Sequence, residues 1–547
     1  MPGVSNLRRT LDRGARGAAC GLPAAVTALA VAELLAVPVR PGAGPLTAVG
    51  GAAIDRTPAA VKDWAIRTFG EADKLALQVG ILAVLALCAV VVGALASHHR
   101  RLGAAAVLSF GAVGAAAALT RPDSGGAVDA LPSLAGGTIG AAVLYLLATL
   151  AADAPDRAAA GGEGVAGGAG SRGGGSRRGF VLAVLATTGA AAGTGALARA
   201  LTTRRARGAV ASRAAVLLPA PASPAPPLPA GVAVRVPGAV PFLTSDQDFY
   251  RVDTALTVPR VDAGTWRLRL HGRGVARPRT YSFAQLLDRP LVERDITLTC
   301  VSNEVGGPYV GTARWLGVPL AELLREAGVR PPSRGGAADQ LVARSVDGMT
   351  IGTPVEDLMD GRDALLAVGM NGEPLSFERG FPVRMVVPGL YGYVSACKWI
   401  EDIELTTFAD YDAYWVRRSW ARRAPVKTQA RIDTPTPFSR LAEGVVMVAG
   451  VAWAQRRGIA RVEVRVDDGP WQEARLAAQD SVDTWRQWSF PWRAAPGGHT
   501  LTVRATDGTG AVQTERRTRT VPDGASGRHS VFVTVTRPGP SNPSGRT

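Results

Sequence analysis

The chain has 547 residues, enough for three or four domains, and its first 200 residues are rich in Ala, Leu, Val and Gly. Its formal net charge of +16 comes mostly from arginines spread through loops and the later part of the chain. They form no basic stripe with interleaved aromatic residues, so we expect no nucleic-acid partner. The four cysteines show no CxxC or Cys/His spacing, which argues against zinc and against a disulfide scaffold.

Five apolar runs dominate the first part of the chain, at about 20–39, 75–97, 102–119, 134–152 and 180–201. Each approaches or exceeds the roughly 18–20 residues that a helix needs to cross about 30 Å of hydrocarbon. Little polar sequence is available to cover them, which argues against buried soluble helices. The sequence therefore predicts a membrane domain of five transmembrane helices at 1–201. Glu33 has two open interpretations, a proton or ion site and a helix-packed carboxyl.

The distribution of arginines predicts the orientation. Cationic clusters lie at 8–16, at 98–101 and in the Gly/Ala/Ser linker 153–178, and all three fall on one side if each run spans once. The positive-inside rule makes that side cytoplasmic, although balanced charges in the loop 40–74 weaken the argument. We expect a multi-pass protein of the cell membrane with a cytoplasmic N-terminus and an extracytoplasmic region after residue 201.

The fifth run begins with a distinctive element, SRRGFVL at 176–182. Paired arginines before a mild apolar run resemble the twin-arginine signal, which directs proteins across the membrane already folded. The alternative is that Arg177 and Arg178 are ordinary positive-inside residues. The small residues ALARA at 196–200 also resemble a signal-peptidase site, but we expect a retained anchor.

The later part of the chain divides into three segments and a tail. Residues 202–240 contain PAPASPAPPLPAG, which favours an extended spacer. Residues 241–424 mix strand-like runs such as TWRLRLHG with short helical runs such as FAQLLD, which indicates an α+β domain. Residues 425–537 contain short alternating strands that end in Gly turns, which predicts an antiparallel, Ig-like β-sandwich. We expect the tail 538–547 to be disordered.

The sharpest local feature is DITLTCVSNEVGG at 295–307. A strand-like run delivers Cys300 to its end, and a polar, Gly-rich turn follows. A thiol at a strand mouth suits a metal thiolate, whereas a packed core cysteine is the alternative from this segment alone. Cys20 and Cys88 lie inside apolar runs and are expected to be buried.

From Phe249 onward the chain resembles the sulfite oxidase family of molybdopterin enzymes, across both the α+β domain and the β-sandwich. The resemblance covers roughly 290 residues and rests on five ordered motifs: DFYRVDTAL, TLTCVSNEVGG, GTARWLGVPL, MNGEPLSFERGFPVRMVVPGLYGYVSACKWIEDIEL and YWVRRSW. In that family one cysteine thiolate binds molybdenum beside the pterin dithiolene. The resemblance thus implies Mo-molybdopterin as cofactor and Cys300 as its metal ligand and a catalytic residue.

The resemblance also implies a set of cofactor-binding residues, with Arg251 catalytic as well: Gln247, Tyr250, Arg251, Arg379, Arg384, Ser395, Ala396, Cys397 and Lys398. Arginine offers a planar fork for phosphate and lysine a point charge. Arg384 and Lys398 are flanked by apolar residues, where an unpaired charge is costly, which favours a bound anion over a surface cation. For Cys397 the alternative is a buried structural thiol.

Three departures from the family pattern concern the substrate. Glu304 and Val305 follow Asn303 where sulfite-oxidising members have two arginines, and Trp420 replaces their active-site tyrosine. Their Arg-Asn-His element reads Arg251-Val252-Asp253 here. Fewer cations and an added acid disfavour sulfite. We therefore expect oxygen-atom transfer to or from a small, sulfoxide-like substrate, with sulfite oxidation to a cytochrome as the alternative.

A non-enzymatic alternative is a cofactor-free scaffold that binds partners through its Ig-like domain. The retained cysteine and cations favour the enzyme. The chain has no evident haem or iron–sulfur motif, so an enzyme needs an external electron carrier, either a cytochrome or a membrane redox protein. The resemblance also implies a homodimer formed through the C-terminal domain.

Overall fold

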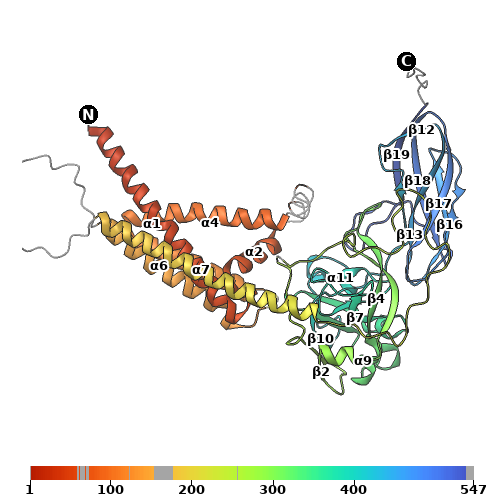
Figure 1. Cartoon of the computed structure of the whole chain (residues 1–547), viewed down its shortest axis with the longest axis horizontal. Helices are drawn as coiled ribbons and strands as arrows, with labels where there is room; N and C mark the ends of the chain where they lie inside the picture. The colour runs from red at the N-terminus through yellow and green to blue at the C-terminus, as the bar shows by residue number, and fades with distance from the viewer. Residues whose placement is uncertain are drawn as a thin grey trace, which may run out of the picture. The chain divides into compact units, whose positions relative to one another are not determined.

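The computed structural model describes residues 2–57, 61, 68, 73–121, 124–152, 177–255 and 257–537. They belong to two compact units, which divide between Gly208 and Ala209. The first unit is helical and the second is built mainly of β-strands (Figure 1). The predicted fold class is therefore confirmed: apolar helices, then a β-rich domain, then a further β-sheet domain. Most of the predicted linker 153–178 and the tail 538–547 lie outside the described residues.

Among the described residues, five helices are long and apolar enough to cross a membrane. They contain the five predicted spans: α1 (Pro2–Val39), α4 (Asp73–His98), α5 (Arg100–Leu119), α6 (Leu131–Ala152) and α7 (Arg177–Ala214). Helix α2 (Pro45–Arg56) was not predicted, and it occupies part of the expected loop 40–74. Its proline lies in the first turn, where the missing N–H costs nothing, and mostly apolar residues follow.

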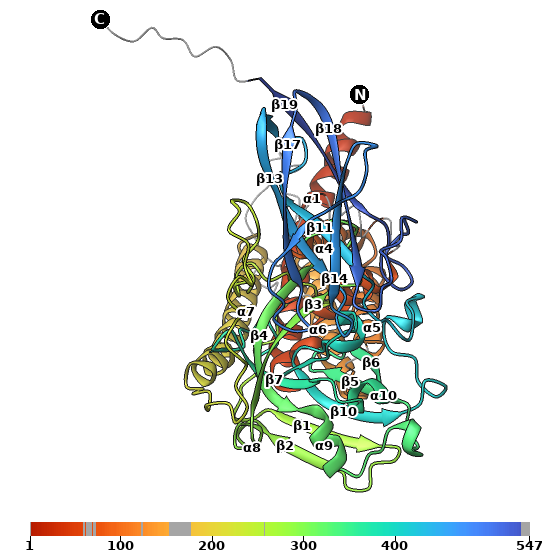
Figure 2. The same cartoon turned by 90° about the vertical axis from the view of Figure 1, so that its right-hand side faces the viewer.

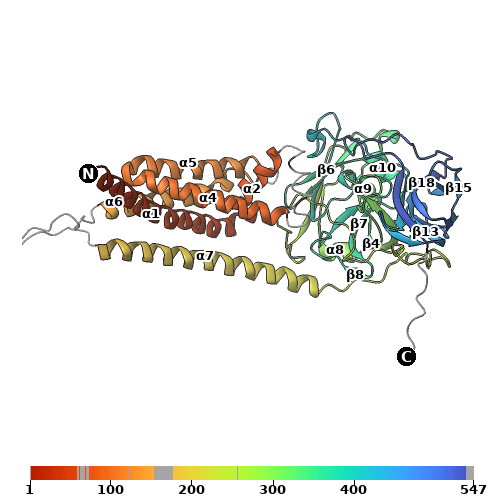
Figure 3. The same cartoon turned by 90° about the horizontal axis from the view of Figure 1, so that it is seen from above.

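Small residues let the membrane helices approach closely. A methyl group added to Gly21 of α1 would lie 1.9 Å from the carbonyl oxygen of Ala89 on α4. A methyl group on Gly137 of α6 would lie 2.9 Å from the Cα of Gly111 on α5. Such backbone contacts are the usual basis of helix association in lipid. Helices α1, α4, α5 and α6 form a bundle, and α7 runs beside it (Figure 3).

The segment 202–240 differs from the predicted spacer in two ways. Helix α7 continues to Ala214, because residues 202–214 contain no proline and Arg213 donates to the carbonyl oxygens of Pro374 and Leu375. The proline-rich part then lies against folded structure. Ala222 N donates to Leu291 O at 2.8 Å, and Glu293 N donates to Ser223 O at 2.9 Å. The proline-rich segment is thus part of the second unit's architecture.

The α+β part of the second unit contains two sheets. The first has the order β2-β1-β10-β5-β6, and Figure 2 shows β1, β2, β5 and β10 side by side. Its strands are β1 (Arg267–Gly272), β2 (Arg279–Ser282), β5 (Gln340–Ser345), β6 (Thr350–Pro354) and β10 (Ile400–Thr406). The second has the order β3-β4-β7-β8, with β9 beside β7. Its strands are β3 (Val292–Thr299), β4 (Val310–Pro319), β7 (Leu365–Met370), β8 (Glu373–Pro374) and β9 (Arg384–Val386).

Four short helices connect these strands: α8 (Phe283–Leu287), α9 (Leu320–Glu326), α10 (Val355–Met359) and α11 (Gly392–Ser395). One continuous core includes the buried Trp315, Phe381 and Leu268. Helix α8 begins with a capping box, in which the hydroxyl of Ser282 accepts from Gln285 N and the Gln285 side chain accepts from Ser282 N.

The last part of the chain forms two packed sheets, in which all but one of the strand pairs are antiparallel. One has the order β11-β13-β17-β16 and contains β11 (Gln429–Thr434), β13 (Gly444–Trp453), β16 (Arg475–Leu476) and β17 (Arg486–Ala494). The other has the order β12-β19-β18-β14-β15 and contains β12 (Arg440–Ala442), β14 (Ile459–Val466), β15 (Gln472–Glu473), β18 (Gly497–Asp507) and β19 (His529–Thr536). Apolar side chains from both sheets share one core, which makes this part a β-sandwich.

Candidate functional site

Cys300 directly follows strand β3, which pairs with β4 along its whole length. The side chain is buried. Its backbone N donates to Tyr309 O at 3.0 Å, and Asn303 N donates to Cys300 O at 3.1 Å. The amide oxygen of Asn303 accepts from Tyr309 N at 2.8 Å, so the turn after the cysteine closes on itself. The predicted strand-mouth geometry is therefore present, although the thiol is covered rather than exposed.

The surroundings of Cys300 favour the protonated form of its thiol. Burial raises the pKa of the thiol, and hydrogen bonds from Ser302 oppose that shift only in part. Burial also raises the pKa of Tyr250, whose ring is close enough to be affected by charge on Cys300. A free thiol here stays neutral at physiological pH, so a metal would have to displace its proton.

Helix α11 begins beside the cysteine strand. A methyl group added to Gly392 would lie 3.8 Å from Thr299 O and 4.0 Å from the hydroxyl oxygen of Tyr250. The following residues include the predicted Ser395 and Ala396. Ser395 is fully buried and its hydroxyl is 3.0 Å from both Leu390 O and Tyr391 O, so its single proton is used within the turn. The Ala396 N–H donates to Gly392 O at 2.9 Å.

Two buried guanidinium groups lie next to this turn. Arg379 and Arg384 are each 6% exposed. Arg379 donates to Tyr250 O at 2.9 Å and also to Asp246 O, so it fixes the segment that carries Tyr250. Arg384 donates to Arg379 O at 3.2 Å and lies over the ring of Trp315 at 5.0 Å. No carboxylate among the described residues forms an ion pair with Arg384, and its Nε has no hydrogen-bond partner there.

The electrostatics of Arg384 favour the binding of an anion. Burial, with a smaller contribution from the positive charge of Arg379, lowers the pKa of its guanidinium to about 10. A buried cation without a counterion is costly, and a phosphate group offers the acceptors and the charge that this guanidinium lacks. The donor set at this position therefore fits the phosphate-bearing tail of a pterin cofactor.

Lys398 and Arg251 form a second cationic group, but both are paired. Lys398 Nζ lies 2.9 Å from Asp253 Oδ2 and donates to Glu378 O at 3.2 Å, while Arg251 Nε lies 3.0 Å from the same Asp253 oxygen. Burial lowers the pKa of Lys398 to about 8, and Asp253 opposes that shift. Asp253, the acid by which this chain departs from the family pattern, is thus neutralised by Lys398 and Arg251 and adds no free negative charge to the site.

The two remaining predicted residues differ in burial. Cys397 is buried, its Sγ lies 3.7 Å from Lys398 O, and burial raises the pKa of its thiol. The side chain of Gln247 is exposed. The structure thus gathers Cys300 with Tyr250, Arg379 and Arg384, and it leaves Gln247 at the surface.

Several residues around Cys300 were missed by sequence reasoning. Tyr391 is buried with a pKa raised to about 12 by that burial, and charge on Cys300 contributes. Three others come from the β-sandwich: Gln455, Arg431 and His529. Gly306 gave a weak signal, because a glycine in a turn often marks a positive φ or a close approach. Its φ is +81° in the structure, but its distant partner cannot be read from the sequence.

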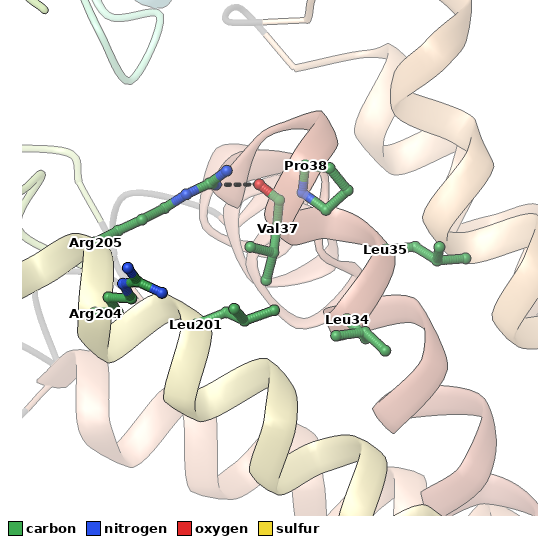
Figure 4. Close-up of a pocket in the computed structure, with 7 residues that line it drawn as sticks. All are labelled: Leu34, Leu35, Val37, Pro38, Leu201, Arg204 and Arg205. Carbon is green, nitrogen blue, oxygen red and sulfur yellow. Dashed lines mark hydrogen bonds between the residues drawn. The ribbon is translucent and has the colours of Figure 1, made fainter.

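A cavity of about 580 Å³ lies elsewhere, between α1 and α7 of the helical unit (Figure 4). Its lining is mostly apolar, with Arg204 and Arg205 from α7. Arg205 donates to Val37 O at the end of α1. The lining contains no acid, thiol or other nucleophile, so this cavity does not compete with the cysteine site as a catalytic centre.

Comparison with known proteins gives the same assignment for the central part of the chain. Residues 255–415 match the oxidoreductase molybdopterin binding domain. Mitochondrial sulfite oxidase of Rattus norvegicus is 30% identical over 279 residues, which cover 43% of this chain and 50% of the relative. A nitrate reductase [NADH] of Oryza sativa is 34% identical over 181 residues, which cover 29% of this chain and 19% of the relative.

Among solved structures, the sulfane dehydrogenase SoxCD from Paracoccus pantotrophus is similar with a TM-score of 0.45 and 26% identity, over 51% of this chain and 78% of that one. The chain spans about half the length of the sulfite oxidases it matches. The matched region contains Cys300, Arg379, Arg384 and Lys398. Residues 255–415 therefore match a molybdopterin-binding oxidoreductase domain, and their similarity to sulfite oxidases implies Mo-molybdopterin as the cofactor.

Proposed function

We propose that this chain is a membrane-anchored molybdenum oxidoreductase that transfers an oxygen atom from a small oxidised substrate, such as a sulfoxide, on the outer face of the cytoplasmic membrane. The observation that carries the proposal is the buried Arg384, which has no counterion among the described residues and which, like the buried thiol of Cys300, acts electrostatically on Tyr250. The five apolar helices support the membrane anchor.

Bound molybdenum supplies two-electron oxygen-atom transfer. The residues of the chain would hold the cofactor: Cys300 as the metal ligand, and Tyr250, Arg251, Arg379, Arg384, Ser395, Ala396, Cys397 and Lys398 around the pterin, with Gln247 at its exposed rim. Soft sulfur suits the metal, and coordination offsets the burial that otherwise keeps the Cys300 thiol protonated. Arg251 would also contact the substrate, since its side chain is 37% exposed.

The surroundings favour a neutral substrate over an anion. Glu304 is exposed where sulfite oxidation would require cations, and Arg251 is already paired with Asp253. Trp420 packs against Tyr393 and Trp415, with ring centroids 5.5 and 6.1 Å apart, and thus extends an aromatic surface. Relatives named as nitrate reductases support the reductive direction. Reduction of a sulfoxide to a sulfide consumes two electrons and two protons and releases water.

The substrate assignment can be tested with the full-length protein in detergent. With a reduced viologen dye as electron donor, we expect a dialkyl sulfoxide to be reduced. With sulfite and an oxidised cytochrome c, we expect kcat/KM to be at least about 10-fold lower, a difference of about 1.4 kcal/mol in transition-state binding. Sulfite turnover at the higher rate would instead establish the sulfite oxidase suggested by the rat relative. If the protein purified from a host that makes the cofactor contained no molybdenum, the enzyme would be excluded and only the scaffold function would remain.

The paired arginines at the start of α7 are proposed to direct folded export. We expect that changing both Arg177 and Arg178 to lysine abolishes the appearance of the C-terminal domain outside the membrane, because the charge is kept and only the signal is lost. Protease accessibility of that domain in intact spheroplasts measures this. The matched control changes Arg204 and Arg205 to lysine at the other end of the helix. Undiminished export of the first variant would show that the arginines act only as ordinary positive charges.

Two partners belong to the same proposal. An external electron carrier, either a cytochrome or a membrane redox protein, would supply the electrons. The β-sandwich would pair two protomers into a homodimer. Exposed apolar side chains at one end of the sandwich support the second idea, since Phe438 is 80% and Val445 68% exposed.

A further inference from the structure

Strand β3, which Cys300 directly follows, lies at the edge of its sheet. Strand β3 pairs with β4 on one side only. The beginning of its other edge is covered by the proline-rich segment at Ala222 and Ser223. The end nearest the cysteine is covered by the β-sandwich, because Thr297 N donates to Asp483 O at 3.0 Å and Trp485 N donates to Thr297 Oγ1 at 2.7 Å. The sandwich therefore completes the sheet next to Cys300.

Gln455 makes the contact closest to the cysteine in sequence. It is 1% exposed and follows the end of β13. Its side-chain nitrogen donates to Thr297 O and to Thr299 Oγ1, each at 3.1 Å. Thr299 is bonded directly to Cys300, so this amide holds the last residues of strand β3 before the thiol. A buried amide used in this way fixes position, because breaking it would leave polar groups unsatisfied.

The turn after the cysteine is held from the same side. Arg431 Nη1 donates to Gly307 O at 2.9 Å, and Asp433 neutralises Arg431 at 2.7 Å. A methyl group added to Gly306 would lie 2.1 Å from Cδ2 of His529, so the imidazole ring packs directly on this turn. Nδ1 of His529 accepts from Ile432 N at 3.0 Å, which places the proton of the neutral ring on Nε2.

We propose that the β-sandwich is a working part of the Cys300 site, in which Gln455 and His529 are positioning residues that order the thiol before any cofactor arrives. The proposal rests on the proposed function in taking Cys300 as the metal ligand. It differs from a dimerisation role, because the contacts lie within one chain and converge on the residues immediately before and after Cys300.

The matched control is a second buried glutamine of the β-sandwich that also contacts a segment outside the sandwich. Gln487 is also 1% exposed, and its amide makes two hydrogen bonds of 2.7 Å, to Val234 N and Val240 O. It therefore resembles Gln455 in residue type, burial and number of contacts, but it holds the segment after α7 rather than β3. A purely structural role predicts the same consequences for Gln455→Leu and Gln487→Leu, whereas a positioning role separates them.

The experiment measures the reactivity of Cys300 in full-length protein made without the cofactor. We expect Gln455→Leu to raise the rate of iodoacetamide alkylation at Cys300 by about 10-fold, since two buried hydrogen bonds are lost, and Gln487→Leu to leave it unchanged. Mass spectrometry assigns the alkylated residue. We expect His529→Leu to behave like Gln455→Leu and His529→Asn to restore the slow rate, because an asparagine oxygen can accept from Ile432 N.

A second measurement uses the cofactor-loaded protein. Gln455→Leu is expected to broaden the electron paramagnetic resonance signal of Mo(V), because the thiolate would occupy several positions. Equal alkylation rates in Gln455→Leu and Gln487→Leu would overturn the positioning role. A different outcome is also informative, in which the two variants differ in alkylation rate while the molybdenum signal does not depend on Cys300. That result would refute Cys300 as the metal ligand, but it would establish that the sandwich orders the thiol.

Discussion

Replacing Arg384 by methionine is expected to empty the cofactor site without weakening the fold. The guanidinium is buried and has no carboxylate partner among the described residues. A cation in this position destabilises the protein unless an anion is bound, so an apolar side chain of similar length should leave the apoprotein as stable as before or more stable. The loss of charge-assisted hydrogen bonds to phosphate should reduce bound molybdenum about 10- to 100-fold.

The control is a buried arginine that has its own counterions. Arg362 has a side chain 8% exposed and pairs with Asp357 and Asp360. Arg362→Met should lower the free energy of unfolding by about 1–3 kcal/mol and leave the molybdenum content of the folded fraction unchanged. Elemental analysis and thermal unfolding of both variants give the comparison. A destabilised Arg384→Met protein that retains its molybdenum would show that Arg384 serves the fold instead.

Replacing Cys300 by serine is expected to remove the molybdenum–thiolate absorption band and to lower activity by more than about 100-fold. Loss of residues that merely support metal ligands already costs 10- to 100-fold, and a direct ligand should cost more. The hydroxyl of serine is a harder donor and stays protonated in the same buried position. The matched control is Cys88→Ser on α4, which should leave both properties unchanged. An intact thiolate band in Cys300→Ser would refute the ligand assignment.

The sequence predicted those features that depend on neighbouring residues. Each of the five apolar helices follows from a continuous apolar run, and the strand just before Cys300 follows from its own alternation and the turn beside it. Features that depend on distant partners were missed. The proline-rich segment looked like a free spacer because nothing in its composition reveals Leu291 as its hydrogen-bond partner.

The same distinction explains the site. The position of Cys300 and the apolar surroundings of Arg384 could be read locally. The pairing of Asp253 with Lys398 could not, and it changed the electrostatic interpretation of the acid. The contacts of Gln455 and His529 with the cysteine strand and turn also join segments far apart in the chain, and no local pattern marks them.

The hydrogen bonds of Ala222 and Ser223 at the beginning of β3 determine where a fragment without the membrane helices should begin. A fragment that began at residue 241, the sequence-based domain boundary, would uncover backbone groups of β3 that now bond to this segment. An uncovered strand edge is a template for pairing with other chains, so such a fragment is prone to aggregate. A soluble fragment that keeps residues 215–240 retains this edge cover and is the sounder starting point for purification.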